Sequence, residues 1–353
     1  VVLVYAVLSS FVFFVFGWRA SGSTLIYSAA ASELYKRQHK ILFRDKRAIG
    51  VEYGLAGKRF QIQCRKEVIL SAGAFGSPQL LLLSGVGPKQ ELDKHGIYQV
   101  HELAGVGDNL QDHIDLIHSY KCSAKKSTFG ISLQMAAEMS RALPEWRRHR
   151  SGKLTSNYAE GIGFFCSDDD VTIPDVEFVF VVAVVDDHAR KIHLSHGFSS
   201  HVTLLRPKSK GTVKLRSADP YDSPRIDPAF FSHPDDMPVM IKAWKKQHQM
   251  LESEVFDDVR GESFYPVDAN DDKAIEQDIR NRADTQYHPV GTCKMGTEQD
   301  PFAVVDNHLC VYGLEGLRVV DASVMPTLIG GNTNAPTIMI AEKVADKIKL
   351  KYG

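Results

Sequence analysis

The stretch KEVILSAGAFGSPQLLLLSGVG, residues 66–87, decides the fold class of this chain. Lys66–Leu70 is expected to form a strand, because its last residues, Val68–Leu70, are a short apolar run typical of buried strands. Residues 71–76 are a turn of mainly small residues, and residues 78–83 predict the start of a short helix. A strand that leads through a glycine-lined turn to a helix N-terminus is the usual way in which α/β proteins approach a phosphate-bearing cofactor. A plain strand-to-helix connection has the same shape, so the pattern predicts an α/β fold and leaves the ligand open.

Capping residues place the ends of this helix. Ser77 is expected as the N-cap and Pro78 as the first helical residue, where its missing N–H costs nothing. Gly85 and Gly87 follow the last apolar residues, and they are expected to end the helix because glycine accepts a positive φ.

The composition is that of a globular protein with a large core. The 353 residues are 44% hydrophobic, and their number predicts about two domains. Lysine and arginine total 42 against 43 aspartates and glutamates, so the basic excess of a nucleic-acid-binding surface is missing. Five widely spaced cysteines without a CxxC pair argue against a disulfide framework and against a zinc ribbon.

The first residues, Val1–Trp18, contain no charge, and Arg19 follows them directly. This length is close to the minimum for a membrane-spanning helix, and it also suits the apolar core of a secretory signal. A buried element or an artefact of the gene model would look the same. If residues 1–18 are genuine, a secreted or membrane-associated protein is expected, with this segment as its only membrane contact.

Short patterns outline the rest of the chain. Strands are expected at residues 41–43 and 51–53 on either side of a turn at 45–50, and at residues 60–64 and 176–185. Helices are expected at residues 131–150 and 236–252. A β-hairpin is expected with His201–Arg206 extended, a turn at 208–211 and Thr212–Leu215 returning.

His288 is the candidate base among the fourteen histidines. It lies in YHPVGTCKMG, residues 287–296, where Pro289 favours an extended backbone before it and Gly291 allows a second bend. An imidazole held on such a turn is suited to accept a proton near neutral pH. A packed core histidine is the alternative.

A second candidate site lies near the C-terminus. Leu317–Val320 predicts a buried strand, and the loop GGNTNAP at residues 330–336 precedes a predicted helix at Thr337–Leu350, with Asn334 as its N-cap. The N-terminus of that helix carries a partial positive charge, which would stabilise negative charge that develops on a bound cofactor.

These stretches resemble the glucose–methanol–choline (GMC) oxidoreductases. GAFGSPQLLLLSGVG at residues 73–87 resembles the second signature of that family, and GVGDNLQDH at residues 105–113 resembles the segment that follows it. Residues 287–296 resemble the motif that carries the catalytic histidine of the family. The resemblance runs from about residue 40 to the C-terminus, and it is closest to insect members of the glucose dehydrogenase branch.

The resemblance implies roles for individual residues around FAD. His288 would accept the hydroxyl proton of an alcohol or sugar, Asn332 would hold the oxygen, and hydride would pass to N5 of the flavin. Asn332 cannot itself be a base, because its amide does not accept a proton at neutral pH. Family positions close to FAD are matched by Gly73, Ala74, Asp321, Ala322 and Thr333. For Asp321, a strand-end cap is the alternative.

The resemblance also implies an α/β architecture with α+β character, as a partial GMC fold. A discontinuous FAD-binding domain is expected at residues 19–111 and 286–353, and a substrate domain with a mostly antiparallel sheet at residues 112–285. The chain contains no GxGxxG, which in the family lies near the N-terminus and binds the ADP half of FAD. We therefore expect the N-terminal Rossmann part to be missing and the chain to be a fragment.

Three functions remain open from the sequence. The first is FAD-dependent oxidation of a small alcohol or sugar, with a quinone or oxygen as the unidentified electron acceptor. The second is a truncated protein without FAD that is inactive or serves in interactions. The third is a hydroxynitrile lyase, which uses the same scaffold without redox turnover.

Overall fold

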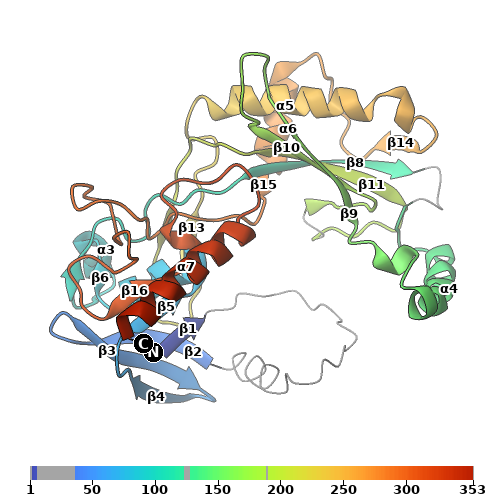
Figure 1. Cartoon of the computed structure of the whole chain (residues 1–353). Coiled ribbons are helices and arrows are strands. Elements are labelled where there is room, and N and C mark those ends of the chain that lie inside the picture. Colours follow the sequence, from blue (N-terminus) through green and yellow to red (C-terminus); the bar gives the residue numbers. More distant parts are fainter. Residues whose placement is uncertain (1, 6–35, 123–127, 188–189, 353) are drawn as a thin grey trace.

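The computed structural model describes residues 2–5, 36–122, 128–187 and 190–352 as a mixed α/β fold. Figure 1 shows a small parallel sheet beside the C-terminal helix in one part of the molecule, and a larger antiparallel sheet with helices in the other. The predicted α/β class is confirmed. The predicted signal or membrane segment lies outside the described residues, apart from residues 2–5. Over the described ranges, no helix is long and apolar enough to cross a membrane.

The parallel sheet has three strands in the order β1–β5–β16. They are β1 (Val2–Tyr5), β5 (Val68–Ser71) and β16 (Leu317–Val319). Both neighbours run parallel to β5, which is the strand of residues 66–87. β5 lies between two strands and is buried. Its sequence is therefore a run of consecutive apolar residues, without the alternation of apolar and polar residues that a half-exposed strand shows.

The helix that follows β5, α2 (Gly73–Leu83), begins at Gly73 and not at Pro78 as predicted. Pro78 therefore lies inside the helix, where it cannot donate a hydrogen bond to the carbonyl of residue 74. The hydroxyl of Thr292 donates to that Ala74 carbonyl instead, at 2.6 Å. A donor from a distant segment thus allows the helix to extend past its proline.

Ser77 is not the N-cap of this helix, which corrects the second capping prediction. Its hydroxyl accepts a hydrogen bond from the N–H of Ala72 at 3.0 Å and donates to a carboxylate oxygen of Asp321 at 2.5 Å. The predicted end of α2 is confirmed, because the helix ends at Leu83 and the glycines that follow, Gly85 and Gly87, both have positive φ, 81° and 156°.

A three-stranded antiparallel sheet consists of β2 (Lys36–Arg44), β3 (Arg47–Leu55) and β4 (Lys58–Gln63). The turn predicted at residues 45–50 is present but shorter, because the chain turns at residues 45–46 and Gly50 lies within β3. Gly50 is there for close packing: a Cβ at this position would lie 2.2 Å from the carbonyl oxygen of Ile62.

The larger sheet has six antiparallel strands in the order β14–β8–β11–β10–β9, with β15 also paired to β8. The strands are β8 (Ile114–Cys122), β9 (Ala159–Phe165), β10 (Val176–Val181), β11 (Gly197–Leu204), β14 (Arg260–Ser263) and β15 (Asp284–Thr285). Figure 1 shows α5 (Asp236–Leu251) and α6 (Asp272–Arg282) over this sheet, with α4 (Leu133–His149) at its far end. The predictions had no strand at β8, whose residues alternate between apolar and polar only in part and are nearly all buried.

The predicted hairpin at residues 201–215 is wrong. β11 lies between β8 and β10, whereas β12 (Thr212–Lys214) pairs with β13 (Arg225–Asp227). The carboxylate of Asp236 accepts the backbone N–H groups of Lys208 and Ser209, at 2.8 and 2.9 Å, and so directs the chain away from β11.

The remaining short elements are β6 (Val86–Gly87), α3 (Lys89–Lys94), β7 (His101–Glu102), three 3₁₀ turns at residues 153–155, 254–256 and 322–324, and the long helix α7 (Asn334–Tyr352). One core cluster draws its residues from 41–106 and 293–344, together with Leu215, and a second from 114–279. The division into domains at residues 111 and 286 stays a prediction.

Candidate active site

The segment that carries His288 runs antiparallel beside residues 111–113. Gln111 and Val290 exchange both backbone hydrogen bonds, at 3.1 and 2.9 Å, and the N–H of Gln286 donates to the carbonyl of His113 at 3.1 Å. Two stretches far apart in the sequence, each similar to a GMC motif, therefore form one short ladder. This ladder places the side chains of His113 and His288 next to each other.

The backbone around His288 is held in an unusual shape. Tyr287 has φ of 64°, a left-handed conformation that is rare for a bulky side chain. One carboxylate oxygen of Asp112 accepts the N–H of His288 at 2.9 Å, and the other accepts the hydroxyl of Thr285. Gly291 has φ of 92°, so the predicted bend is present. Strain of this kind is typical of functional sites, where the surroundings hold one geometry.

The imidazole of His288 contacts two polar side chains. Its Nδ1 lies 2.9 Å from Nδ1 of His113, and its Nε2 lies 3.3 Å from Nδ2 of Asn332. The other ring nitrogen of His113, Nε2, lies 2.9 Å from the carbonyl oxygen of Ile329. The two predicted catalytic residues thus lie together, although their roles stay a prediction. The sequence analysis gave no role to His113 or Asp112. Their place at the end of residues 105–113, which resemble a GMC motif, is the feature that could have identified them.

Burial shifts the pKa of each of these side chains towards its uncharged form, and it keeps the two imidazoles neutral near pH 7. It lowers the pKa of His288, against a smaller raising effect from the charge of Asp115. Burial and the neighbouring His288 lower the pKa of His113 to about 4. Burial raises the pKa of Asp112 to about 6, although hydrogen bonds from Thr285 and from the backbone oppose that rise. A neutral imidazole is the form that can accept a proton.

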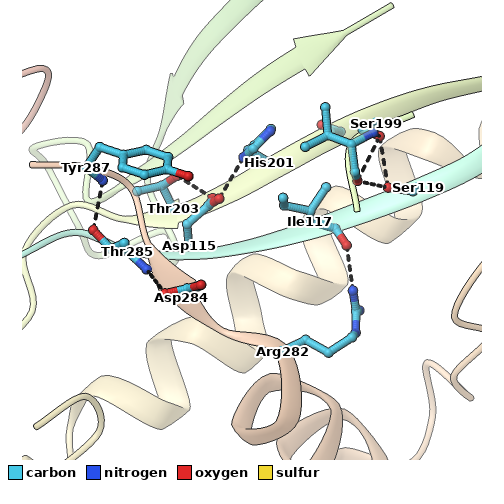
Figure 2. A network of polar contacts seen from close by, with 12 residues as sticks. Asp115, Ile117, Ser119, Ser199, His201, Thr203, Arg282, Asp284, Thr285 and Tyr287 are labelled. Atoms are coloured by element: carbon cyan, nitrogen blue, oxygen red, sulfur yellow. Dashed lines mark hydrogen bonds and ion pairs between the residues drawn. The ribbon is translucent and has the colours of Figure 1, made fainter. Parts of the chain in front are cut away.

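A second polar cluster lies on the adjacent strands of the six-stranded sheet (Figure 2). Asp115 on β8 accepts hydrogen bonds from Thr203, at 2.9 Å, and from His201, at 2.6 Å. Burial alone would lower the pKa of His201, but the charge and hydrogen bond of Asp115 raise it. Glu177 on β10 is fully buried, and in the described part of the chain neither of its oxygens has a hydrogen-bond partner. Among the described residues, Asp115 therefore has hydrogen-bond donors and Glu177 has none.

The residues predicted to lie near FAD surround the start of α2. Gly73 has φ of 77°, and its N–H donates to Asp321 at 2.9 Å. The other oxygen of Asp321 accepts the N–H of Ser323 at 2.8 Å, so this carboxylate caps a 3₁₀ turn and holds α2 at the same time. The alternative of a strand-end cap is confirmed for Asp321. Ala322 is the first residue of that turn, and Ala74 is buried behind Gly73.

The loop at residues 330–333 leads into α7. This helix begins at Asn334 and not at Thr337, so Asn334 is its first residue and not its N-cap. The carbonyl of Thr333 accepts the N–H and the hydroxyl of Thr337, at 3.1 and 2.7 Å, which closes the first turn. Asn332 thus lies two residues before the start of α7, whose N-terminus carries a partial positive charge.

Two glycines leave the backbone open at these places. A Cβ added to Gly73 or to Gly331 would meet no atom within 4 Å in the described part of the molecule. Among the described residues, the backbone at the start of α2 and before α7 is therefore open on one side, and it leaves room for a flat cofactor such as FAD. As for metals, no group of three His, Cys, Asp or Glu side chains among the described residues could hold an ion.

Comparisons with known proteins agree with this architecture. Two family models, both described as GMC oxidoreductase, match residues 19–115 and 207–341. An alcohol dehydrogenase [acceptor] of Pseudomonas putida is 44% identical over 316 residues, which are 88% of this chain and 56% of that protein. The human mitochondrial choline dehydrogenase is 42% identical over 314 residues, 88% of this chain and 52% of that protein.

Among solved structures, a formate oxidase of Aspergillus oryzae RIB40 superposes on this chain with a TM-score of 0.81 at 27% sequence identity. Its structure was solved to study how a mutation affects modification of its FAD. That match covers 90% of this chain and 60% of the other. The chain spans about half the length of the alcohol and choline dehydrogenases that it matches. From the two family models and the shared fold, the chain belongs to the GMC oxidoreductase family.

Proposed function

We propose that this chain carries the catalytic base of an FAD-dependent oxidoreductase that oxidises the CH–OH group of an alcohol. The observation that supports it best is the contact between His288 and Asn332, 3.3 Å from ring nitrogen to amide nitrogen, at the N-terminus of α7. A base and a neutral hydrogen-bond donor at one point suit an alcohol, whose oxygen loses a proton while it stays bound.

In the proposed reaction, Nε2 of His288 takes the proton of the substrate hydroxyl. The amide of Asn332 donates a hydrogen bond to the substrate oxygen and holds it while its charge rises. Asp112 keeps the base in place through the backbone N–H of His288. FAD, when bound, would supply the acceptor for the hydride of the substrate carbon.

Gly73, Ala74, Asp321, Ala322 and Thr333 are the residues that we propose to hold or shape the FAD site. Gly73 would let the cofactor approach the backbone, and Ala74, the second residue of α2, adds only a methyl group beside it. Asp321 acts through the loop that it holds and not as a free ligand, because its oxygens already accept hydrogen bonds from Gly73, Ser77 and Ser323.

The substrate is proposed only as a class. The relatives from Pseudomonas putida and from human mitochondria are named for the oxidation of alcohols and choline, which supports an alcohol. The finer predictions, a sugar substrate and a branch close to the insect glucose dehydrogenases, have no support from those names and stay predictions.

The test begins with the visible spectrum of the purified protein after incubation with FAD. Flavin bands at about one per chain are expected, and a protein that FAD cannot reconstitute would instead support the inactive or interaction function. With a flavin-containing protein, anaerobic mixing with an alcohol should bleach the flavin. Bleaching would contradict a hydroxynitrile lyase, which does not reduce its flavin.

Variants then test the assigned residues. His288→Gln and Asn332→Ala should slow the anaerobic reduction of the flavin by about a hundredfold and by about tenfold. His233→Gln, a half-exposed histidine on the loop before α5, is the matched control and should leave the rate unchanged. If His288→Gln reduced its flavin at the wild-type rate, the assignment of the base would be wrong.

A further inference from the structure

Four groups form a continuous line of hydrogen bonds through the site. The carbonyl of Ile329 contacts Nε2 of His113, Nδ1 of His113 contacts Nδ1 of His288, and Nε2 of His288 contacts the amide nitrogen of Asn332. The three distances are 2.9, 2.9 and 3.3 Å. The planes of the two rings lie nearly at right angles, 88°.

The first link decides where the protons lie. A backbone carbonyl can only accept a hydrogen bond, so Nε2 of His113 must carry a hydrogen. A neutral imidazole has a single N–H, and burial keeps His113 neutral. Nδ1 of His113 is therefore an acceptor. The hydrogen between the two rings must then belong to Nδ1 of His288.

The far end of the line fits the same arrangement. With its one hydrogen on Nδ1, neutral His288 has a lone pair on Nε2. The nitrogen of the Asn332 amide only donates, so it requires an acceptor at that position. Both ends of the line thus agree on one arrangement of protons.

We propose that His113 is a positioning residue, which uses the carbonyl of Ile329 to hold neutral His288 in its Nδ1–H form, so that Nε2 is the atom that accepts the substrate proton. The second half of this statement rests on the proposed function, whereas the first half does not. The arrangement also survives the reaction, because protonated His288 still donates its Nδ1–H to His113. In this way the base is oriented before and after it takes the proton.

The test is ¹⁵N NMR on protein labelled at histidine, near neutral pH and without substrate. His288 is assigned by the loss of its signals in His288→Gln. The expected result for the wild type is a protonated Nδ1 and an unprotonated Nε2 on His288. The opposite tautomer in the wild type would overturn the proposal by itself, whether or not any variant folds.

Two substitutions at one position separate positioning from packing. His113→Gln keeps an acceptor towards His288 and a donor towards Ile329, so it should preserve the Nδ1–H form. His113→Leu removes both and should convert His288 to the other tautomer or to a mixture. His233→Gln is the control, with no expected change. If His113→Leu left His288 in the Nδ1–H form, His113 would not be the group that sets the tautomer.

Flavin reduction adds a second readout. His113→Leu should slow reduction by an alcohol by about a hundredfold, and His113→Gln should recover most of that rate. If NMR shows the expected tautomer but no variant changes the rate, the positioning is correct and the proposed oxidation is wrong. If NMR shows the opposite tautomer while His288→Gln is inactive, the oxidation stands and the positioning by His113 is wrong.

Discussion

The carboxyl group of Asp112 makes a quantitative prediction about stability. Burial raises its pKa from the ordinary 3.8 to about 6, and the side chain is only 6% exposed. A carboxyl group that binds its proton more tightly in the folded state stabilises the fold at low pH. That stability is lost as the pH rises from about 4 to about 6. A rise from 3.8 to about 6 corresponds to about 3 kcal/mol of lost stability once the group is ionised in both states.

Asp112→Asn removes this loss, because an amide does not ionise and its oxygen can still accept the N–H of His288. Relative to the wild type, the variant should gain about 2 kcal/mol in the free energy of unfolding between about pH 4.5 and pH 7. The substitution also changes the contact with Thr285. That change alters the free energy of unfolding by the same amount at both pH values, so it cancels in the difference. Urea unfolding at the two pH values, followed by far-UV circular dichroism, measures it.

Thr285→Val is the matched control. It removes the hydroxyl that lowers the pKa of Asp112 but keeps the carboxyl group, so the loss of stability should remain and move to higher pH. A difference between Asp112→Asn and the wild type that stays constant within about 0.5 kcal/mol would refute the reasoning. It would mean that Asp112 ionises in the folded protein as it does in the unfolded chain.

Three further predictions test the surroundings of the base. Asp115→Asn removes the charge that raises the pKa of His288. The acid limb of the pH profile of flavin reduction should therefore move to lower pH. A limb at the same pH as in the wild type would contradict this coupling. Gly291→Ala should lower the melting temperature and cost about 1–3 kcal/mol, because φ is 92° and the new Cβ would lie 2.5 Å from a backbone oxygen. Thr292→Val leaves the carbonyl of Ala74 without its hydroxyl donor and should cost about 1–3 kcal/mol of unfolding free energy, whereas Thr292→Ser should restore it.

Much of the fold could be predicted from local patterns. The strand at residues 68–71, the helices at 133–149 and 236–251 and the bend at Gly291 follow from apolar periodicity and from residues that favour one backbone shape. These signals act over a few residues, and at these places the tertiary structure agrees with them. The motifs at residues 73–87 and 287–296 likewise identified the family from consecutive residues alone.

Other features depended on partners that are distant in the sequence. The helix α2 begins before its proline because the hydroxyl of Thr292, 218 residues away, donates to the carbonyl of Ala74. β11 pairs with β8 and β10 instead of turning back on β12, since the choice of strand partner is decided by the whole sheet. No pattern within a single segment carries this information.

The sequence by itself determined which family the chain belongs to and which histidine is the candidate base. Only the tertiary structure decided what surrounds that base: His113 at its Nδ1, Asn332 at its Nε2 and Asp112 at its backbone N–H. The reason is physical, because a pKa and a tautomer are set by burial and by the nearest hydrogen-bond partners. Those partners come from two segments, residues 112–113 and residue 332, and folding alone brings both to His288.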